Sequence, residues 1–410
     1  MSKIKKLTAL FLITAMMLTC CVFSVSAASA ITLEIDGNIV TPAVAPVVES
    51  GTTFVPLKVV FQTLGATVAW SDALKQVTVT TAAYTVVFTI NSKTYTVNGS
   101  SKTLDVAPKI IKDSTMIPIS AFSGTIGADA SYDAAANKVT VKYFTKGTSG
   151  SISMSGSSAL YPLAQMAADQ FKSLNPKISM NVAAGGSGTG LNNVLSKTVD
   201  IGNSDVYAAE KLTADDAKTL VDHKVCLIGV ALIVNADVGA TVKNLTKAQL
   251  KSIFIGDITN WKEVGGPNEQ ITVVNRPSSS GTRALFVKWA LDGQKDVEGD
   301  MSLQTDDSNA LLATVGNTKG TIGYLALSYL VNSNAKVSKI QIDGVDATYD
   351  NIYNNKYQVW GYEHMYTNGA PSGAVAMFLD YMTSSDIASK AEAVGYGAIS
   401  KLNATAAGSR

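Results

Sequence analysis

Hydrophobic and polar residues follow different patterns in the two halves of the chain. In the first half, short runs alternate with a period of two, as in residues 76–80, which predicts strands with one buried face. From residue 151 onward, short β-like runs alternate with stretches of helical apolar spacing, such as residues 160–174. Alternating strands and helices are typical of α/β domains with parallel strands. The pattern therefore predicts a small, mostly-β or α+β domain followed by a larger α/β domain.

Residues 31–143 contain an internal repeat with a period of 62 residues. Repeats that stay in register over many positions indicate two copies of one structural unit. Each unit is predicted to combine short strands with one short helix, which covers residues 57–64 in the first unit. Trp70 and Tyr132 occupy equivalent positions, and we expect both to fill the core. The other matching segments are residues 35–37 and 97–99, 54–57 and 116–119, 65–66 and 127–128, and 77–79 and 139–141.

The length of 410 residues is enough for two or three domains, and a content of 46% hydrophobic residues is enough to build their cores. We expect a repeat domain over residues 31–143, a polar Gly/Ser linker over 144–150 and an α/β domain over 151–402. Lys and Arg total 33 and Asp and Glu total 32. This balance excludes a general electrostatic attraction to nucleic acid or to a membrane surface, so any anion site must be local.

The N-terminus has the features of a secretion signal. Lys3, Lys5 and Lys6 precede a largely apolar run, and small residues allow cleavage after Ala27. We therefore expect residues 1–27 to be removed and the protein to be secreted or held at the extracellular face of the cell envelope. The repeat domain could then contact cell-wall material, an alternative that the sequence leaves open.

The cysteines predict no disulfide framework. Lipid anchoring at Cys20 or Cys21 is an alternative, but the preceding residues match the small-residue pattern of a lipidation site poorly. Cys226 lies in an apolar run and is expected to be a buried core residue.

The most informative segment of the second half is Arg276-Pro-Ser-Ser-Ser-Gly-Thr282. It follows a β-like run, residues 271–275, and precedes a predicted helix. The N-terminus of a helix presents free N–H groups, and Arg276 adds a charged planar fork of donors. The segment alone is equally compatible with a helix cap and a surface arginine. Three other Ser- and Gly-rich segments are predicted to form similar loops, at residues 155–160, 185–190 and 200–205.

These loops lack the residues of an enzyme site. The chain has only His223 and His364, and neither lies in a serine-rich loop, so a serine hydrolase or phosphatase would lack its base. The glycines of residues 185–190 do not fit the dinucleotide-binding fingerprint, and no full phosphate-loop lysine pattern occurs. The sequence therefore predicts a binding protein without cofactor or metal.

Both halves resemble known families. Residues 31–143 resemble the copper amine oxidase N-terminal-like, or stalk, domain, through the motif Phe-Val-Pro-Leu at residues 54–57 and the segments at 64–70 and 77–79. The second half resembles the PstS-like phosphate-binding proteins of bacterial ABC importers. The motifs that carry this resemblance are residues 156–162, 185–190, 200–205, 244–246, 253–261, 263–266, 276–282 and 320–324.

The second resemblance implies a two-lobed periplasmic-binding-protein fold of the Venus flytrap type (type II), with inorganic phosphate in the cleft and delivery to ABC permease subunits. Lobe one would comprise residues 150–230 and the C-terminal stretch, and lobe two the middle. The chain would cross near residues 230–235 and again after Tyr324. The phosphate contacts carried over by position are Ser158, the backbone of Ala159, Ser187, Asp205, Arg276, Ser280, Gly281 and Thr282.

Asp205 would select the ligand by its proton. Phosphate near neutral pH keeps a proton to donate, whereas sulfate does not, so a buried carboxylate penalises sulfate. The sequence departs from the family at Ser278, where many members have an acid that braces the arginine. Two alternatives remain on the same fold. One is a binder of another oxyanion, such as molybdate, tungstate or sulfate, and the other is a cell-surface protein that senses phosphate while its repeat domain anchors the chain.

Overall fold

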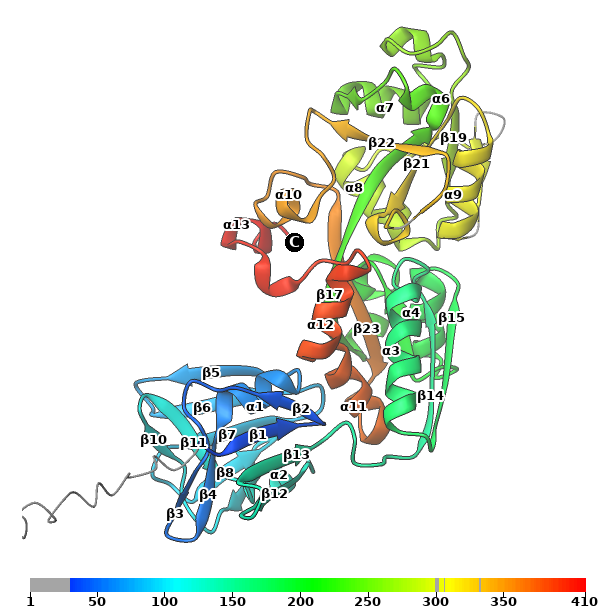
Figure 1. The fold of residues 1–410 in the computed structure, drawn as a ribbon. Helices are drawn as coiled ribbons and strands as arrows, with labels where there is room; N and C mark the ends of the chain where they lie inside the picture. The colour runs from blue at the N-terminus through cyan, green and yellow to red at the C-terminus, as the bar shows by residue number, and fades with distance from the viewer. Residues whose placement is uncertain (1–29, 299–301, 306, 332) are drawn as a thin grey trace, which may run out of the picture.

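The structure is a computed structural model that describes residues 30–298, 302–305, 307–331 and 333–410. The expected signal segment, with Cys20 and Cys21, lies outside the described residues. Figure 1 shows a repeat domain beside a two-lobed α/β domain whose lobes are stacked one above the other. In the part of the chain that the structure describes, no helix is both long and apolar enough to cross a membrane.

The repeat domain consists of short strands and two helices, and nearly every strand of its first half has a counterpart 62 residues later. Its first and last strands, β1 and β13, pair in parallel and so close the domain. The elements are β1 Thr32–Ile35, β2 Asn38–Val40, β3 Val47–Glu49, β4 Thr52–Pro56, α1 Leu57–Thr63, β5 Thr67–Ser71, β6 Gln76–Thr80, β7 Thr85–Thr89, β8 Thr94–Val97, β9 Ser100–Thr103, β10 Lys109–Ile111, β11 Ser114–Pro118, α2 Ala121–Thr125, β12 Asp129–Asp133 and β13 Lys138–Lys142.

The prediction that Trp70 and Tyr132 fill equivalent core positions is wrong. Trp70 is 45% exposed, because β5 is the edge strand of the sheet β5-β6-β7-β8-β9 and leaves this ring without a covering neighbour. Tyr132 is half-buried and donates its hydroxyl to Asn137 at 3.1 Å. The core is formed instead by aliphatic and phenylalanine side chains, among them Phe61 and Phe122, whose ring centroids are 5.3 Å apart.

Lobe one of the α/β domain has parallel strands covered by helices. The strands β14, β15 and β16 run parallel, and β16 pairs antiparallel with β23. The elements are β14 Gly150–Gly156, α3 Tyr161–Leu174, β15 Ile178–Ala184, α4 Ser187–Leu195, β16 Ile201–Ser204, α5 Ala214–Lys218, β23 Trp360–Asn368, α11 Gly373–Met382 and α12 Ser385–Ala393.

Lobe two repeats this plan with β19 parallel to both β20 and β21. Its elements are α6 Ala236–Gly239, β18 Asn244–Leu245, α7 Lys247–Ile255, β19 Thr272–Asn275, α8 Gly281–Ala290, β20 Ser302–Gln304, α9 Ser308–Asn317, β21 Thr321–Ala326 and β22 Val337–Ile342. Short helices α10 Tyr349–Tyr353 and α13 Ala404–Ala407 lie beside the junction of the lobes (Figure 1). Single turns of 3-10 helix are η1 Ala208–Glu210, η2 Trp261–Val264, η4 Leu327–Tyr329 and η5 Ile399–Lys401.

One long strand, β17 Leu220–Asn235, joins the lobes. Its first part, up to Gly229, pairs with β23 in lobe one, and its last part pairs with β21 and β22 in lobe two. The first crossing therefore lies at residues 229–230, at the start of the predicted range. The second crossing, predicted after Tyr324, follows β22 and uses the segment before β23. The extended strand β17 carries the chain across the first time, and a segment of turns, coil and the short helix α10 carries it back.

The repeat domain packs directly on lobe one. One hydrophobic cluster includes side chains of both, such as Phe61 of α1 and Phe171 of α3. Asp380 of α11 accepts hydrogen bonds from the Tyr143 hydroxyl at 2.8 Å and from the Ala82 N–H at 2.6 Å. Burial raises the pKa of Asp380 to about 6, and those two hydrogen bonds oppose the shift. In Figure 1 the repeat domain accordingly lies against α11 and α12.

Candidate functional site

The predicted binding residues come together where the two lobes meet. Ser158 and Ala159 follow β14, Ser187 begins α4, and Asp205 follows β16, all in lobe one. Arg276, which follows β19, and Ser280, Gly281 and Thr282 at the start of α8 belong to lobe two. The residues of this set that have polar side chains are each at most 4% exposed. The segment 200–205, expected as a polar loop, is instead the buried strand β16 with Asp205 at its carboxyl end, because its side chains are enclosed on both faces.

Arg276 provides the positive charge of the site. Its Nη2 donates to Ser158 Oγ at 3.2 Å, across the lobe boundary, and its Nη1 donates to Ser308 Oγ at 3.3 Å. Its Nε donates to the Thr305 carbonyl at 3.1 Å. Burial lowers the pKa of Arg276, while the nearby Asp205 acts in the opposite direction. Since an arginine stays charged even after such a shift, the site offers a desolvated cation to an anion.

Ser278 stands where many members of the family have an acid that braces the arginine. Here Arg283 holds the backbone instead, donating from Nη1 to the Arg276 carbonyl at 2.7 Å. Arg283 is itself paired with Asp296 at 2.6 Å. The Thr305 carbonyl described above holds the guanidinium. The neutral Thr305 carbonyl and the backbone contact from Arg283 therefore orient Arg276 in place of a neighbouring acid.

Asp205 is the acidic member of the site. Its Oδ2 accepts from the Thr282 hydroxyl at 2.7 Å, and its backbone N–H donates to Ser187 Oγ at 2.9 Å. Its Oδ1 is buried and has no hydrogen-bond partner among the described residues. A buried carboxylate oxygen without a donor is costly, so this oxygen can accept a hydrogen bond from a group that enters the site.

The N-terminus of α8 supplies donors. Ser280 is its N-cap and accepts from the Arg283 N–H at 3.2 Å. The other N–H groups of the first turn have no intrahelical partners, as at the start of any helix. Gly281 permits the close approach of the lobes, because a Cβ there would lie 2.1 Å from Ser187 Oγ. Serine and glycine at these positions thus leave helix N–H groups of the kind that bind anions next to the opposite lobe.

The lobes are in contact around the site. The Gly188 N–H donates to the Ser279 carbonyl at 2.9 Å, and Lys211 Nζ donates to the Ser278 carbonyl at 2.7 Å. The Tyr329 hydroxyl donates to the Ser158 carbonyl at 2.5 Å. The structure is therefore a closed form of the two-lobed domain.

Sequence reasoning missed Ser308, which is 0% exposed and lies 3.0 Å from Ser158 Oγ. The pair Asp307-Ser308 precedes an apolar helical stretch, and Asp307 caps α9. That cap signal could have marked another helix N-terminus at the cleft. Tyr329 and Lys211 carry no local motif that would have indicated their contacts.

The other chemically active side chains are engaged elsewhere. His364 Nδ1 is 2.7 Å from Asp222 Oδ1, and His223 Nε2 is 3.2 Å from Thr367 Oγ1, so neither histidine bonds a serine within the described residues. Cys226 is buried and free, as expected, and burial raises the pKa of its thiol. The described residues contain no cluster of His, Cys, Asp and Glu suited to a metal ion.

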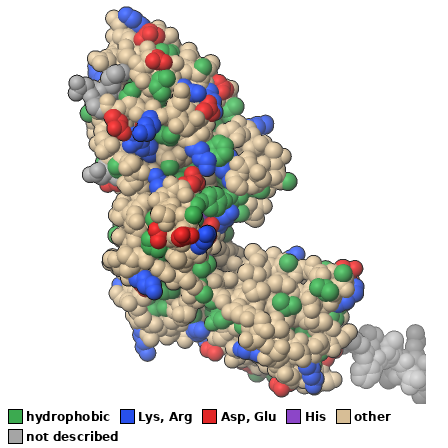
Figure 2. Space-filling view, turned by 180° about the vertical axis from the view of Figure 1, so that it is seen from behind, with side chains coloured by type: hydrophobic (Ala, Val, Ile, Leu, Met, Phe, Trp, Pro, Cys, Tyr) green, Lys and Arg blue, Asp and Glu red, His purple; other side chains and the backbone are tan. Residues whose placement is uncertain are grey.

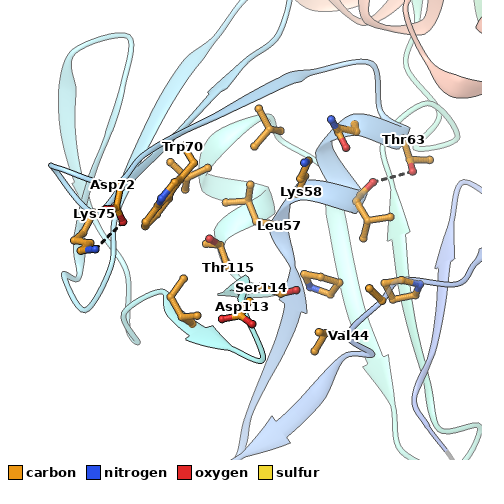
Figure 3. Close-up of a pocket in the computed structure, with 18 of the residues that line it drawn as sticks. Val44, Leu57, Lys58, Thr63, Trp70, Asp72, Lys75, Asp113, Ser114 and Thr115 are labelled. Atoms are coloured by element: carbon orange, nitrogen blue, oxygen red, sulfur yellow. Dashed lines mark hydrogen bonds and ion pairs between the residues drawn. The ribbon is translucent and has the colours of Figure 1, made fainter. Parts of the chain in front are cut away.

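The repeat domain carries an open groove of about 890 Å³. Figure 3 shows Trp70 on one wall, with Leu57 and Lys58 of the α1 start nearby and Asp113, Ser114 and Thr115 on the opposite side. An aromatic ring beside apolar and polar groups is compatible with several ligand classes. The groove is remote from the residues that carry the lobe-junction site.

The comparisons with known proteins concern both halves of the chain. A family model described as the PBP superfamily domain matches residues 142–386. The phosphate-binding protein PstS of Bacillus subtilis is 50% identical over 239 residues, which are 58% of this chain and 77% of that protein. This chain belongs to the PstS family. PstS of Borreliella burgdorferi is 27% identical over 241 residues, covering 57% of this chain and 85% of that protein.

Structural comparison gives the same family. A candidate phosphate ABC transporter substrate-binding protein of Clostridium perfringens, solved with bound phosphate, matches with a TM-score of 0.55 and 28% identity over 61% of this chain and 100% of that chain. The expected two-lobed periplasmic-binding-protein fold is therefore confirmed. A model described as the copper amine oxidase N-terminal domain matches residues 34–141, which confirms the resemblance of the repeat domain.

Proposed function

We propose that this PstS-family chain binds inorganic phosphate between its lobes and delivers it to the membrane subunits of an ABC importer. The observation that carries the proposal is that a buried cation, Arg276, and a buried acid, Asp205, lie in one closed site. Arg276 and the hydroxyls of Ser158, Ser280 and Thr282 attract an oxyanion. The unpartnered Asp205 Oδ1 requires that this oxyanion also donate a hydrogen.

Phosphate meets both requirements near neutral pH because it retains at least one proton. Sulfate, molybdate and tungstate are fully deprotonated there, so each would place an oxygen against Asp205 with no hydrogen between them. Sites that recognise a ligand by a buried hydrogen bond discriminate by about 10⁴–10⁵ against an analogue that lacks it. Ser187, Ala159 and Gly281 are assigned to the same site through their backbone or hydroxyl groups.

Isothermal titration with phosphate, sulfate and molybdate at one pH and ionic strength tests the proposal. We expect tight binding of phosphate, much weaker binding of the other ions, and loss of phosphate binding in Arg276→Gln. Lys75→Gln is the control, since Lys75 is an exposed cation of the repeat domain. Equal affinity for phosphate and sulfate, or no binding of phosphate, would refute the proposal.

We further propose that the protein is not an enzyme and works outside the cytoplasmic membrane. The engagement of both histidines away from the serines supports the first statement. Turnover of p-nitrophenyl phosphate that is lost in Ser280→Ala would contradict it. Fractionation into medium, membrane and cell wall, with and without residues 31–143, tests the location. Wall retention that needs those residues would support a cell-wall role for the repeat domain.

A further inference from the structure

A second buried acid, Glu363, lies beside the ligand-facing Asp205. Glu363 belongs to β23 and pairs with Cys226 of β17, next to the bulge between Lys224 and Cys226. It therefore lies beside β17, the strand that joins the two lobes. The side chain is 0% exposed.

The carboxyl oxygens of this pair lack ordinary partners. Both Glu363 oxygens and Asp205 Oδ1 are buried without a hydrogen-bond partner among the described residues. Two carboxylates can only accept, so two facing carboxyl groups form a hydrogen bond only when one of them carries a proton. One such proton would give one Glu363 oxygen and Asp205 Oδ1 a partner each, and Oδ1 would keep a second acceptor site for the ligand.

The surroundings place this proton on Glu363. Burial raises the pKa of Glu363 well above its usual range, and the negative charge of Asp205 acts in the same direction. The other titratable groups that interact with Glu363 are Cys226, Tyr349 and Tyr396, none of which is a cation. Asp205, in contrast, faces the positive charges of Arg276 and Lys211.

We propose that Glu363 is a specificity-determining positioning residue that remains protonated and donates a hydrogen bond to Asp205, which holds the Asp205 carboxyl group in place as the acceptor for the ligand's proton. The inference rests on the proposed phosphate function. Without this donor, the Asp205 side chain is no longer fixed against the ligand, and the penalty that it imposes on sulfate falls.

The test compares two neutral replacements. Glu363→Gln keeps the size and a donor, whereas Glu363→Leu keeps neither a donor nor a charge. Titrations with phosphate and sulfate near pH 7 should show Glu363→Gln within about threefold of the wild type, and a phosphate-to-sulfate preference reduced by about tenfold or more in Glu363→Leu. Glu49→Gln, an exposed acid of the repeat domain, is the matched control.

The pH profile gives a readout that a purely structural role would not change. Wild type and Glu363→Gln are titrated with phosphate between about pH 6 and 9, and the ratio of their dissociation constants removes the titration of phosphate itself. While Glu363 keeps its proton the two profiles should run parallel, and the wild type should lose affinity relative to Glu363→Gln only at a pH at which Glu363 ionises and adds a second negative charge to the site. An infrared difference between the two proteins should show a protonated carboxyl group at neutral pH.

The absence of a protonated carboxyl band that Glu363→Gln removes, or a sulfate preference that is unchanged in Glu363→Leu, would overturn this inference while wild-type phosphate binding stands. A wild type that does not bind phosphate would instead refute the proposed function. Thermal unfolding of each variant shows whether it is folded, and Glu363→Gln keeps the test decisive if Glu363→Leu is not.

Discussion

Replacing Gly281 by alanine should prevent the lobes from closing on the ligand. A Cβ at this position would lie 2.1 Å from Ser187 Oγ, 2.9 Å from Ser187 Cβ and 2.9 Å from Asp205 Cβ. Rotation of the serine hydroxyl relieves the first contact but neither of the other two. The methyl group must therefore push α8 of lobe two away from lobe one, which moves the donors of α8 away from Ser187 and Asp205.

The size of the effect follows from the cost of overpacking a closed interface, about 1–3 kcal/mol. Because the added methyl group meets these atoms only when the lobes are together, the cost falls on the closed form alone. Ligand affinity should then fall by about 5- to 150-fold, since about 1.4 kcal/mol corresponds to a tenfold change. The backbone of Gly281 has no positive φ, so alanine causes no separate backbone strain.

Calorimetric titration with phosphate measures this loss, and thermal unfolding with and without phosphate gives a second estimate. Gly316→Ala is the matched control, because Gly316 lies in α9 of the same lobe and the nearest atom to its added Cβ is 3.4 Å away. We expect the control to bind like the wild type. If Gly281→Ala also binds phosphate like the wild type, the closed arrangement of Ser187, Asp205 and α8 is not the bound form.

Three further predictions concern the acids and the helix cap. Asp205→Asn should strengthen sulfate binding by about tenfold or more because the amide supplies a donor, while Asp200→Asn should not; equal sulfate affinity in both titrations would contradict this. Burial raises the pKa of Asp380 to about 6, so its carboxyl favours the folded state most at low pH and this contribution is lost as the pH rises through about 6. Asp380→Asn, which Tyr143 can still bond, should therefore gain stability relative to the wild type by up to about 3 kcal/mol between about pH 4 and 7, measured by denaturant unfolding; parallel pH curves would contradict it. Ser280→Ala should remove the cap of α8 at a cost of about 1 kcal/mol and also weaken phosphate binding, and an unchanged midpoint of unfolding would show that the cap contributes nothing.

Local patterns predicted the parts of the site that depend on one segment. The order of strand, serine-rich turn and helix placed Ser280 at the start of α8, since each of these features leaves a short-range signal. Contacts between distant segments leave no such signal. Ser308 bonds Ser158 across the cleft, and Glu363 meets Asp205 from another strand, so both became visible only when the fold had brought them together.

The prediction that Trp70 is buried was wrong for a different reason. A large aromatic residue in an alternating strand is usually buried, and the inference was sound for its neighbours Val77 and Val79 on β6. The error came from the position of β5 at the edge of its sheet, which depends on how the strands are ordered in space. Sequence alternation determines which residues share a face but does not show whether another element covers that face.

The docking of the repeat domain has a consequence for how the lobes move. The hydrogen bonds to Asp380 join the repeat domain to α11. The Asn175 amide, at the end of α3, donates to the Phe144 carbonyl of the linker at 2.8 Å. The Thr383 hydroxyl adds a bond to the Gly65 carbonyl at 3.1 Å. All of these partners belong to lobe one. We therefore expect lobe two to move about β17 and the segment before β23 when the cleft opens, without disturbing the contact between the domains.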